Sequence, residues 1–181
     1  MLAGPNGAGK TTFHEAHLSQ LGLPFLNADV LAHETGIDAY EAAKSISAIR
    51  DEFIAQGIGF VTETVLSDPV GEKVGVLARA AETGFDVTLI YIGIESADLS
   101  RRRVNARVAA GGHDVPTEKL SARYERSLDN LERAIVQLPR VLIYDNSSFN
   151  SPHRFLAEFH SGEKIRTGEG RLPNWTARIL A

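Results

Sequence analysis

The sequence contains no cysteine. This absence excludes a disulfide framework and a thiolate metal site, and it is typical of proteins from a reducing compartment. Long hydrophobic runs are absent too, since no apolar stretch approaches the roughly 20 residues that a membrane-spanning helix needs. We therefore expect a cytoplasmic protein without a signal peptide and without a membrane as its partner.

The sequence has no large excess of positive charge either. The 19 lysines and arginines face 23 aspartates and glutamates, so the net charge is −4 and the isoelectric point lies near 5.9. Proteins that bind duplex nucleic acid or anionic membranes carry a strong basic surplus. We expect no nucleic-acid partner, and any anion has to be bound locally. A length of 181 residues with 43% hydrophobic residues predicts one globular domain over residues 1–181.

What the sequence does contain is a phosphate-binding motif near its first residue. Residues 4–12, GPNGAGKTT, match G-x-x-x-x-G-K-[ST] in full. The glycines let backbone N–H groups turn inward around an anion, Lys10 offers a charge to the β- and γ-phosphates of a nucleotide, and the Thr11 hydroxyl suits a Mg²⁺ ion. We predict that the nucleotide is held by Gly4, Asn6, Gly7, Ala8, Gly9, Lys10, Thr11 and Thr12.

The stretch before this motif is short. Only Met1, Leu2 and Ala3 precede it, whereas the strand that leads into such a loop normally has about 4–8 residues. We therefore expect the natural chain to start further upstream, and intact-mass measurement of the endogenous protein tests this expectation.

Apolar residues recur at helical spacing in stretches that alternate with short strands. The pattern predicts helices at about 11–20 and 38–56, around 74–81, after Ser96, and from about 117 to 135, with strands at 25–27, 59–62, 86–92 and 140–144. This alternation predicts an α/β fold with a mostly parallel sheet and helices on both faces. The tail, about 153–181, is expected to form an edge hairpin or a loose wrap.

Several polar residues directly follow predicted strands. The carboxyl ends of parallel strands share one edge of the sheet, where ligands bind. Asp29 at this edge could accept a proton from a substrate hydroxyl or help to hold Mg²⁺; alternatively it only caps the following helix. Glu63 and Thr64 could orient an acceptor molecule, or they could belong to a solvated loop. Asp145 and Asn146 follow the last strand of this set.

Arginines gather on two helices that flank a glycine-containing connector, residues 107–116. Arg103 and Arg107 share a face of the first helix, and Arg123 and Arg126 share a face of the second. Such an arrangement, about 101–127, is typical of a lid whose arginines grip phosphates. The alternative is a solvated basic face that pairs with Glu118, Glu125 and Glu132 and accounts for Arg101, Arg102 and Arg133. We interpret His113 in the connector as a loop residue.

Six blocks stand out in the sequence: residues 4–12, 27–29, 60–64, 111–116, 123–127 and 144–147. In this order they resemble the zeta-toxin-type P-loop kinases, and most closely their bacterial branch often labelled predicted ABC-type ATPases. The resemblance extends to about Glu158. It implies a three-layer P-loop NTPase fold of nucleoside-kinase type, with ATP as donor and Mg²⁺ as cofactor. The implied reaction is phosphorylation of a small hydroxyl acceptor, which in zeta toxins is a UDP-linked N-acetyl amino sugar.

The resemblance also implies roles for individual residues. Lys10 and Thr11 would hold phosphates and metal, and Asp29, a second metal ligand, would be the catalytic base. Arg107 and Arg123 would face the transferred phosphoryl group. Arg103 and Asn146 would bind the nucleotide, with Arg103 stacked on adenine, while Glu63, Thr64 and Arg126 would touch the acceptor. By family alone, an antitoxin protein is expected as a partner.

The preferred interpretation is an ATP-dependent small-molecule kinase. A kinase that acts on a nucleic-acid end is disfavoured by the acidic balance and the few aromatic residues. A nucleotide-dependent switch or binding module without an acceptor stays open as the alternative. The combination of Asp29 with Arg107 and Arg123 favours the kinase, because a switch has less use for a base and two arginine-bearing helices.

Overall fold

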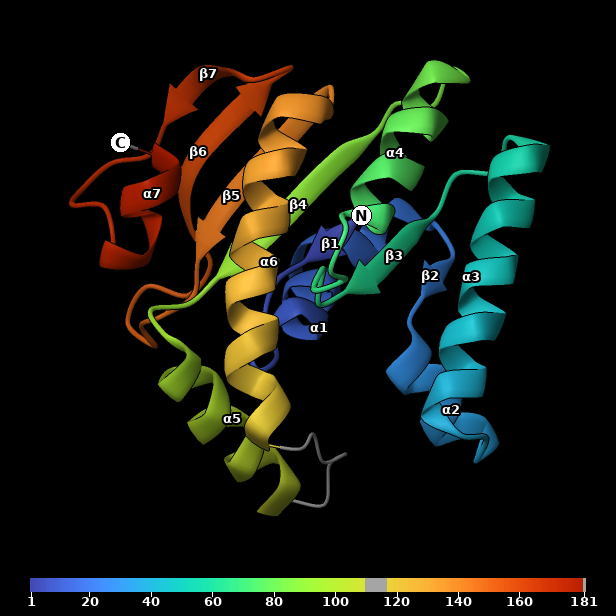
Figure 1. The fold of residues 1–181 in the computed structure, drawn as a ribbon, viewed down its shortest axis with the longest axis horizontal. Coiled ribbons are helices and arrows are strands. Elements are labelled where there is room, and N and C mark those ends of the chain that lie inside the picture. Colours follow the sequence, from blue (N-terminus) through green and yellow to red (C-terminus); the bar gives the residue numbers. More distant parts are fainter. Residues whose placement is uncertain (110–116, 181) are drawn as a thin grey trace.

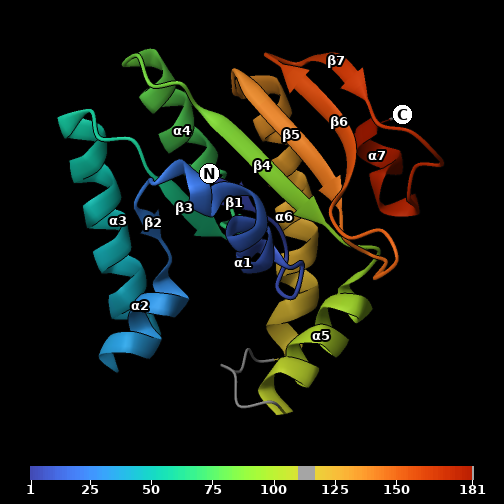
Figure 2. The ribbon, with the colours of Figure 1, turned by 180° about the vertical axis from the view of Figure 1, so that it is seen from behind.

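The computed structural model describes residues 1–109 and 117–180. Within these residues, seven strands form one sheet in the order β2-β3-β1-β4-β5-β6-β7. Helices α4 and α6 cover one face of the sheet and α1 covers the other (Figures 1 and 2). This mostly parallel sheet between two layers of helices confirms the predicted fold class.

The strands β1 to β5 are parallel to one another, whereas β6 pairs antiparallel with β5 and β7 pairs antiparallel with β6. In the centre, β1 (Leu2–Ala3) lies between β3 (Val61–Thr64) and β4 (Thr88–Gly93), and the register sets Leu2 opposite Glu63. On the outer sides, β2 (Phe25–Leu26) pairs with β3, and β5 (Arg140–Asp145) pairs with β4. The end of β3 therefore lies beside the start of the phosphate-binding loop.

The tail continues the sheet. Strands β6 (Arg154–His160) and β7 (Glu163–Thr167) form an antiparallel hairpin at the edge next to β5, which decides between the two predicted forms in favour of the hairpin. A 3-10 turn (Asn174–Thr176) and α7 (Ala177–Leu180) follow. The buried indole of Trp175 donates to Asp145 at 2.9 Å, and a Cβ on Gly93 would lie 2.2 Å from its ring, so this turn is packed onto the ends of β4 and β5.

The helices near the amino end differ from simple expectation. Helix α1 (Lys10–Phe13) runs directly into a π-helical turn (His14–Leu18) and a 3-10 turn (Ser19–Leu21), so the predicted helix at 11–20 is helical but irregular. Helix α2 (Ala28–Thr35) was not predicted, because it buries none of its residues and so carries no apolar stripe. Helix α3 (Ala39–Gln56) starts where the Asp38 carboxylate accepts from the Tyr40 N–H at 2.7 Å.

The remaining helices follow the predicted periodicity. Helix α4 (Glu72–Glu82) buries Val74 and Leu77, and α5 (Ala97–Ala109) starts after Ser96, whose hydroxyl accepts from the Leu99 N–H. Helix α6 (Thr117–Gln137) buries the predicted face, namely Leu120, Tyr124, Leu128, Leu131 and Ile135. In the described part of the chain, no helix has both the length and the apolar character to cross a membrane.

Candidate functional site

The phosphate-binding loop takes a shape that only glycine allows at its two ends. Gly4 has φ 144°, and a Cβ there would lie 2.1 Å from the Ile92 carbonyl oxygen of β4. Gly9 has φ 85°, and a Cβ there would lie 2.5 Å from the Asn146 amide. The loop is therefore pressed against the ends of β4 and β5, and it has no room for side chains at these two positions.

Every carbonyl of the loop from residue 5 to residue 9 is held by a side chain. Each of these carbonyls thus already accepts a hydrogen bond, whereas the first N–H groups of α1 have no partner within the helix and are available to an anion. A positive seat of this kind fits the phosphates of a nucleotide. The contacts are Lys10 Nζ to Pro5 O (3.2 Å), Ser100 Oγ to Asn6 O (2.7 Å), Arg103 Nη1 to Gly7 O (3.3 Å), Asn146 Nδ2 to Ala8 O (2.8 Å) and His153 Nε2 with Gly9 O (3.2 Å).

Lys10 lies at the centre of the seat and is only 7% exposed. Its Nζ is 3.7 Å from Oε1 of Glu63. Burial lowers the pKa of Lys10; Glu63 and Asp29 oppose this shift, and Arg107 adds to it. A nucleotide phosphate would add negative charge beside this buried ammonium group, which so far has one carboxylate in ion-pair range.

Glu63 is drawn toward the loop. Its Oε2 accepts from the Thr11 hydroxyl at 3.1 Å and from the Asn27 amide at 3.0 Å. Hydroxyl and carboxylate oxygens are ligands that Mg²⁺ takes beside nucleotide phosphates, so Glu63 could hold this metal together with the predicted Thr11 and Asp29. No single-sequence pattern could pair Thr11 with Glu63, because the contact depends on β3 lying next to β1.

Asp29, the second residue of α2, does not cap this helix. The Asn27 side chain accepts from the backbone N–H of Asp29 at 2.8 Å and of Val30 at 3.2 Å, so Asn27 is the cap of α2. The carboxylate of Asp29 is exposed and has neither a hydrogen bond nor a close ion pair with the described residues. The capping alternative for Asp29 is therefore wrong, and its carboxylate stays available for chemistry.

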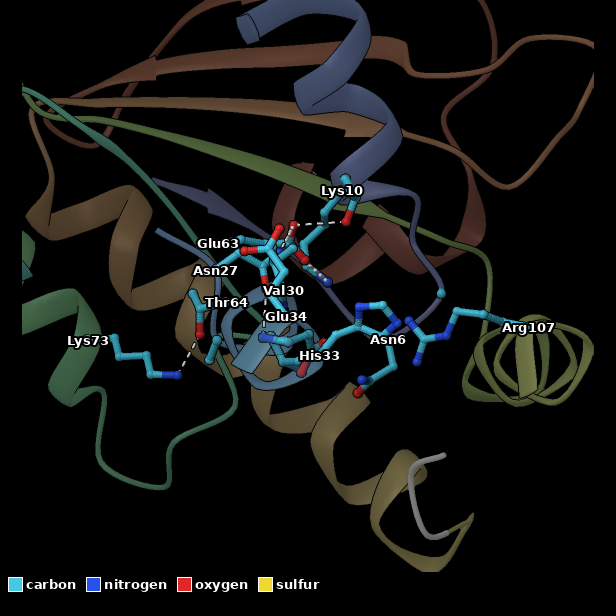
Figure 3. A pocket seen from close by; sticks show the side chains of 15 residues that line it. Asn6, Lys10, Asn27, Val30, His33, Glu34, Glu63, Thr64, Lys73 and Arg107 are labelled. Atoms are coloured by element: carbon cyan, nitrogen blue, oxygen red, sulfur yellow. Dashed lines mark hydrogen bonds and ion pairs between the residues drawn. The ribbon is translucent and has the colours of Figure 1, made fainter. Parts of the chain in front are cut away.

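These groups surround a single hollow of about 460 Å³ (Figure 3). Among the residues with predicted roles, it is lined by Asn6, Gly7, Lys10, Thr11, Asp29, Glu63, Thr64 and Arg107. Seven further lining residues had no predicted role, namely Asn27, Ala28, Val30, His33, Glu34, Val65 and Lys73. The N-cap signal of Asn27 could have been found in the sequence, whereas Val30, His33, Glu34 and Lys73 carry no recognisable pattern.

Three predicted arginines lie outside this lining. Arg103 holds the loop from its outer side: besides Gly7 O it contacts Ser147 O at 3.4 Å, and its guanidinium is 5.2 Å from the ring centre of Phe149. Arg123 is half-buried on α6. Arg126 donates through Nε to the Ser67 carbonyl at 2.8 Å, so it holds a turn of the backbone instead of pointing into the hollow.

The glutamates that were expected to pair with the basic helices have other partners. Glu125 and Glu132 of α6 both contact Arg178 of α7, and Arg101 pairs with Asp98 of its own helix at 2.8 Å. This corrects the pairing proposed for the solvated basic face. Most of the connector 107–116, including His113, lies outside the described residues.

Comparisons with known proteins agree with this geometry. The AAA_33 family model, an AAA domain, matches residues 1–133. An uncharacterized protein of Haemophilus influenzae is 29% identical over 126 residues, which are 67% of this chain and 88% of that protein. A solved chain from the PezAT chromosomal toxin–antitoxin system of Streptococcus pneumoniae has a TM-score of 0.62 at 18% identity, over 99% of this chain and 80% of that one. The chain thus shares its fold with the toxin–antitoxin chain and belongs to the AAA domain family.

Proposed function

We propose that this protein is an ATP-dependent kinase that transfers the γ-phosphoryl group to a hydroxyl of a small molecule, with residues 1–181 acting as one domain. The observation that carries the proposal is the Asp29 carboxylate, which lines the same hollow as Lys10 and Thr11 and is not used for capping. A phosphate seat alone supports nucleotide binding. A carboxylate beside it supports removal of a proton from an acceptor.

The proposed reaction is a single in-line transfer. Asp29 takes the proton of the acceptor hydroxyl while the hydroxyl oxygen bonds to the γ-phosphorus, and the bond from that phosphorus to the bridging oxygen breaks to release ADP. Lys10 and the inward N–H groups hold the phosphates, and Arg107 in the lining offsets charge on the moving group. Mg²⁺, when bound, adds positive charge at the phosphate oxygens, and Thr11, Glu63 and Asp29 are the residues that would hold it.

Other residues take supporting roles in the proposal. Arg103 and Asn146 hold the loop from outside and would flank the nucleotide base, as the family resemblance implies. Arg123 would approach the transferred phosphoryl group from α6. Thr64 would contact the acceptor directly, while Arg126 would act on it through the turn at Ser67.

The acceptor and partner follow from family resemblance. A nucleotide-linked amino sugar is the acceptor that the zeta-toxin type suggests, and an antitoxin protein is the corresponding partner. The similarity in fold to a chain of a toxin–antitoxin system supports this direction. A cytoplasmic location completes the proposal.

Labelled ATP and a metabolite extract test the proposed reaction. The wild type should transfer label to one or a few compounds. Asp29→Asn should bind ATP as before and lose at least about a hundredfold in transfer, because the proton acceptor is gone. Asp86→Asn, an exposed carboxylate before β4, is the matched control and should behave as the wild type.

Two outcomes would contradict this proposal. Full transfer by the Asp29 variant would remove the base from the mechanism. Bound ATP with no labelled acceptor in any extract would favour the nucleotide-dependent switch, which needs the seat and no acceptor.

A further inference from the structure

Lys73, the second residue of α4, extends from its helix into the hollow at the side away from Arg107 (Figure 3). Its Nζ donates to the Thr64 hydroxyl oxygen at 2.5 Å. We call these two residues the Thr64–Lys73 pair. Nothing in the reaction above uses Lys73, although a half-buried lysine that lines a hollow needs a reason for being there.

The Thr64–Lys73 pair presents only hydrogen-bond donors to the hollow. A hydroxyl has one donor and two acceptor sites. The Thr64 oxygen already accepts from Lys73 and from the Leu66 N–H at 3.2 Å, so its own hydrogen is left to donate. Lys73 uses one of its three N–H groups on Thr64 and has two more. A partner for this pair must therefore be an acceptor of hydrogen bonds.

The charge around Lys73 is not balanced by a close carboxylate. Among the described residues, no acidic side chain forms an ion pair with Lys73. The carboxylate of the nearby Asp68 has other partners, because it accepts from the Glu72 N–H at 2.5 Å and from the Asn130 amide. Burial lowers the pKa of Lys73; Asp68 and Glu72 oppose this shift, while Arg50 and Arg123 add to it. The ammonium group of Lys73 therefore lines the hollow without a carboxylate of the described residues in close contact.

The turn at residues 65–68, between Thr64 and the start of α4, is fixed in place by α6. The Asn130 amide donates to the carbonyls of Leu66 (2.9 Å) and Asp68 (2.8 Å), and Ser127 donates to Val65 O at 2.8 Å. Leu66 is fully buried and has φ 58°, a conformation that is uncommon outside glycine. The donors of the Thr64–Lys73 pair are therefore set in position before a ligand arrives.

We infer that the Thr64–Lys73 pair is an anion-binding subsite for the acceptor and that Lys73 determines its specificity. The substrates are then small hydroxyl compounds that already carry a phosphate or carboxylate group, because both groups offer only acceptor oxygens and a negative charge. The acceptor would lie with its anionic end at Lys73 and its reactive hydroxyl at Asp29. This inference rests on the proposed kinase function.

A titration tests the subsite without knowledge of the acceptor. The protein is saturated with Mg²⁺ and a non-hydrolysable ATP analogue, and inorganic phosphate or acetate is added in separate calorimetric experiments, which distinguish a phosphate from a carboxylate site. At least one anion should bind to the wild type, and its affinity should fall about tenfold or more in Lys73→Gln. Lys44→Gln, an exposed lysine of α3, is the matched control and should keep wild-type affinity.

Fractionation of the metabolite extract tests the substrate class. Anion exchange at neutral pH separates retained, anionic compounds from the flow-through, and each fraction is incubated with labelled ATP. Label should enter the anionic fraction, and Lys73→Gln should raise the KM of the labelled compound more than it lowers kcat. Lys73→Arg, which keeps the charge, should retain most of the activity, and melting curves of each variant verify folding.

The outcomes separate this inference from the kinase proposal. Equal anion affinity in the wild type and Lys73→Gln, or no binding of either anion, overturns the subsite. Label confined to the neutral fraction overturns it as well and leaves the kinase proposal standing. If no fraction takes label although the nucleotide binds, the kinase proposal fails, and the titration alone then decides whether Lys73 binds anions.

Discussion

The donor half of the site, residues 4–12 with the side chains that hold them, is more buried than the proposed acceptor half. We use the term acceptor half for α2, the residues after β3 and α3, which packs against α2. In the donor half, Gly4, Pro5, Ala8 and Lys10 are buried. In the acceptor half, α2 buries no residue and α3 buries only Ala42, while the ring of Tyr40 is 74% exposed. The two halves meet at Thr11 and Glu63.

Under the proposed function, this difference matches what each half would recognise. A nucleotide triphosphate presents the same phosphates in every reaction, so a seat that is assembled beforehand costs little and binds at once. Acceptors differ between enzymes, and lightly packed helices can be changed without loss of the core. In this protein the exception in the acceptor half is the turn at 65–68, which α6 holds firmly.

The largest expected effect is the loss of the donor seat. Lys10→Ala should weaken ATP binding by about a hundredfold, because the substitution removes a charged donor from a buried phosphate site. Calorimetry with ATP and Mg²⁺ measures this, and Lys44→Ala, an exposed lysine of α3, is the control. If both variants bind ATP equally, the seat does not depend on its lysine and the contrast between the halves loses its basis.

Hydrogen exchange compares the two halves directly. Amides of α2 and α3 should open with a free energy at least about 1.4 kcal/mol below that of amides in β4, which corresponds to a tenfold faster exchange. The reason is that α2 and α3 contribute almost nothing to the core. Mass spectrometry of the exchanged protein measures this, and uniform protection across both halves would contradict the comparison.

A smaller effect is expected from a single contact on the loop. Ser100→Ala removes the hydroxyl that holds the Asn6 carbonyl at 2.7 Å, and we expect ATP affinity to fall about fivefold, in line with the loss of one buried hydrogen bond. Ser151→Ala, at an exposed serine, controls for the substitution itself. Unchanged affinity in Ser100→Ala would mean that the other four contacts hold the loop without it.

The smallest effect concerns pH. Burial lowers the pKa of His153 below 6.5; the Gly9 carbonyl opposes this shift, and His17 and Arg103 add to it. A histidine with a lowered pKa in the folded state stabilises it fully above pH 6.5, and this contribution is lost as the pH falls toward the folded pKa. The stability difference between the wild type and His153→Asn should therefore shrink from pH 7.5 to pH 5.5, as measured by urea unfolding. A constant difference would remove the titration of His153 from the account.

Most of the donor half could be predicted from the sequence, whereas much of the acceptor half could not. The loop motif is local in sequence, and the spacing of apolar residues in α6 predicts which face of this helix is buried. The contact of Lys73 with Thr64 depends instead on a turn in which Leu66 adopts a left-handed conformation. No residue pattern in the sequence predicts this conformation. Arg126 shows the same limit, because helical spacing predicted its face but not that its side chain would bind Ser67 O.

The five contacts on the loop carbonyls also impose an order in time on the nascent protein. The loop is synthesised before four of the side chains that hold it, namely Ser100, Arg103, Asn146 and His153. During most of its synthesis the chain thus carries a phosphate-binding motif whose supports have not yet been made. The last of these contacts, between His153 and the Gly9 carbonyl, can form only after residue 153 has been synthesised.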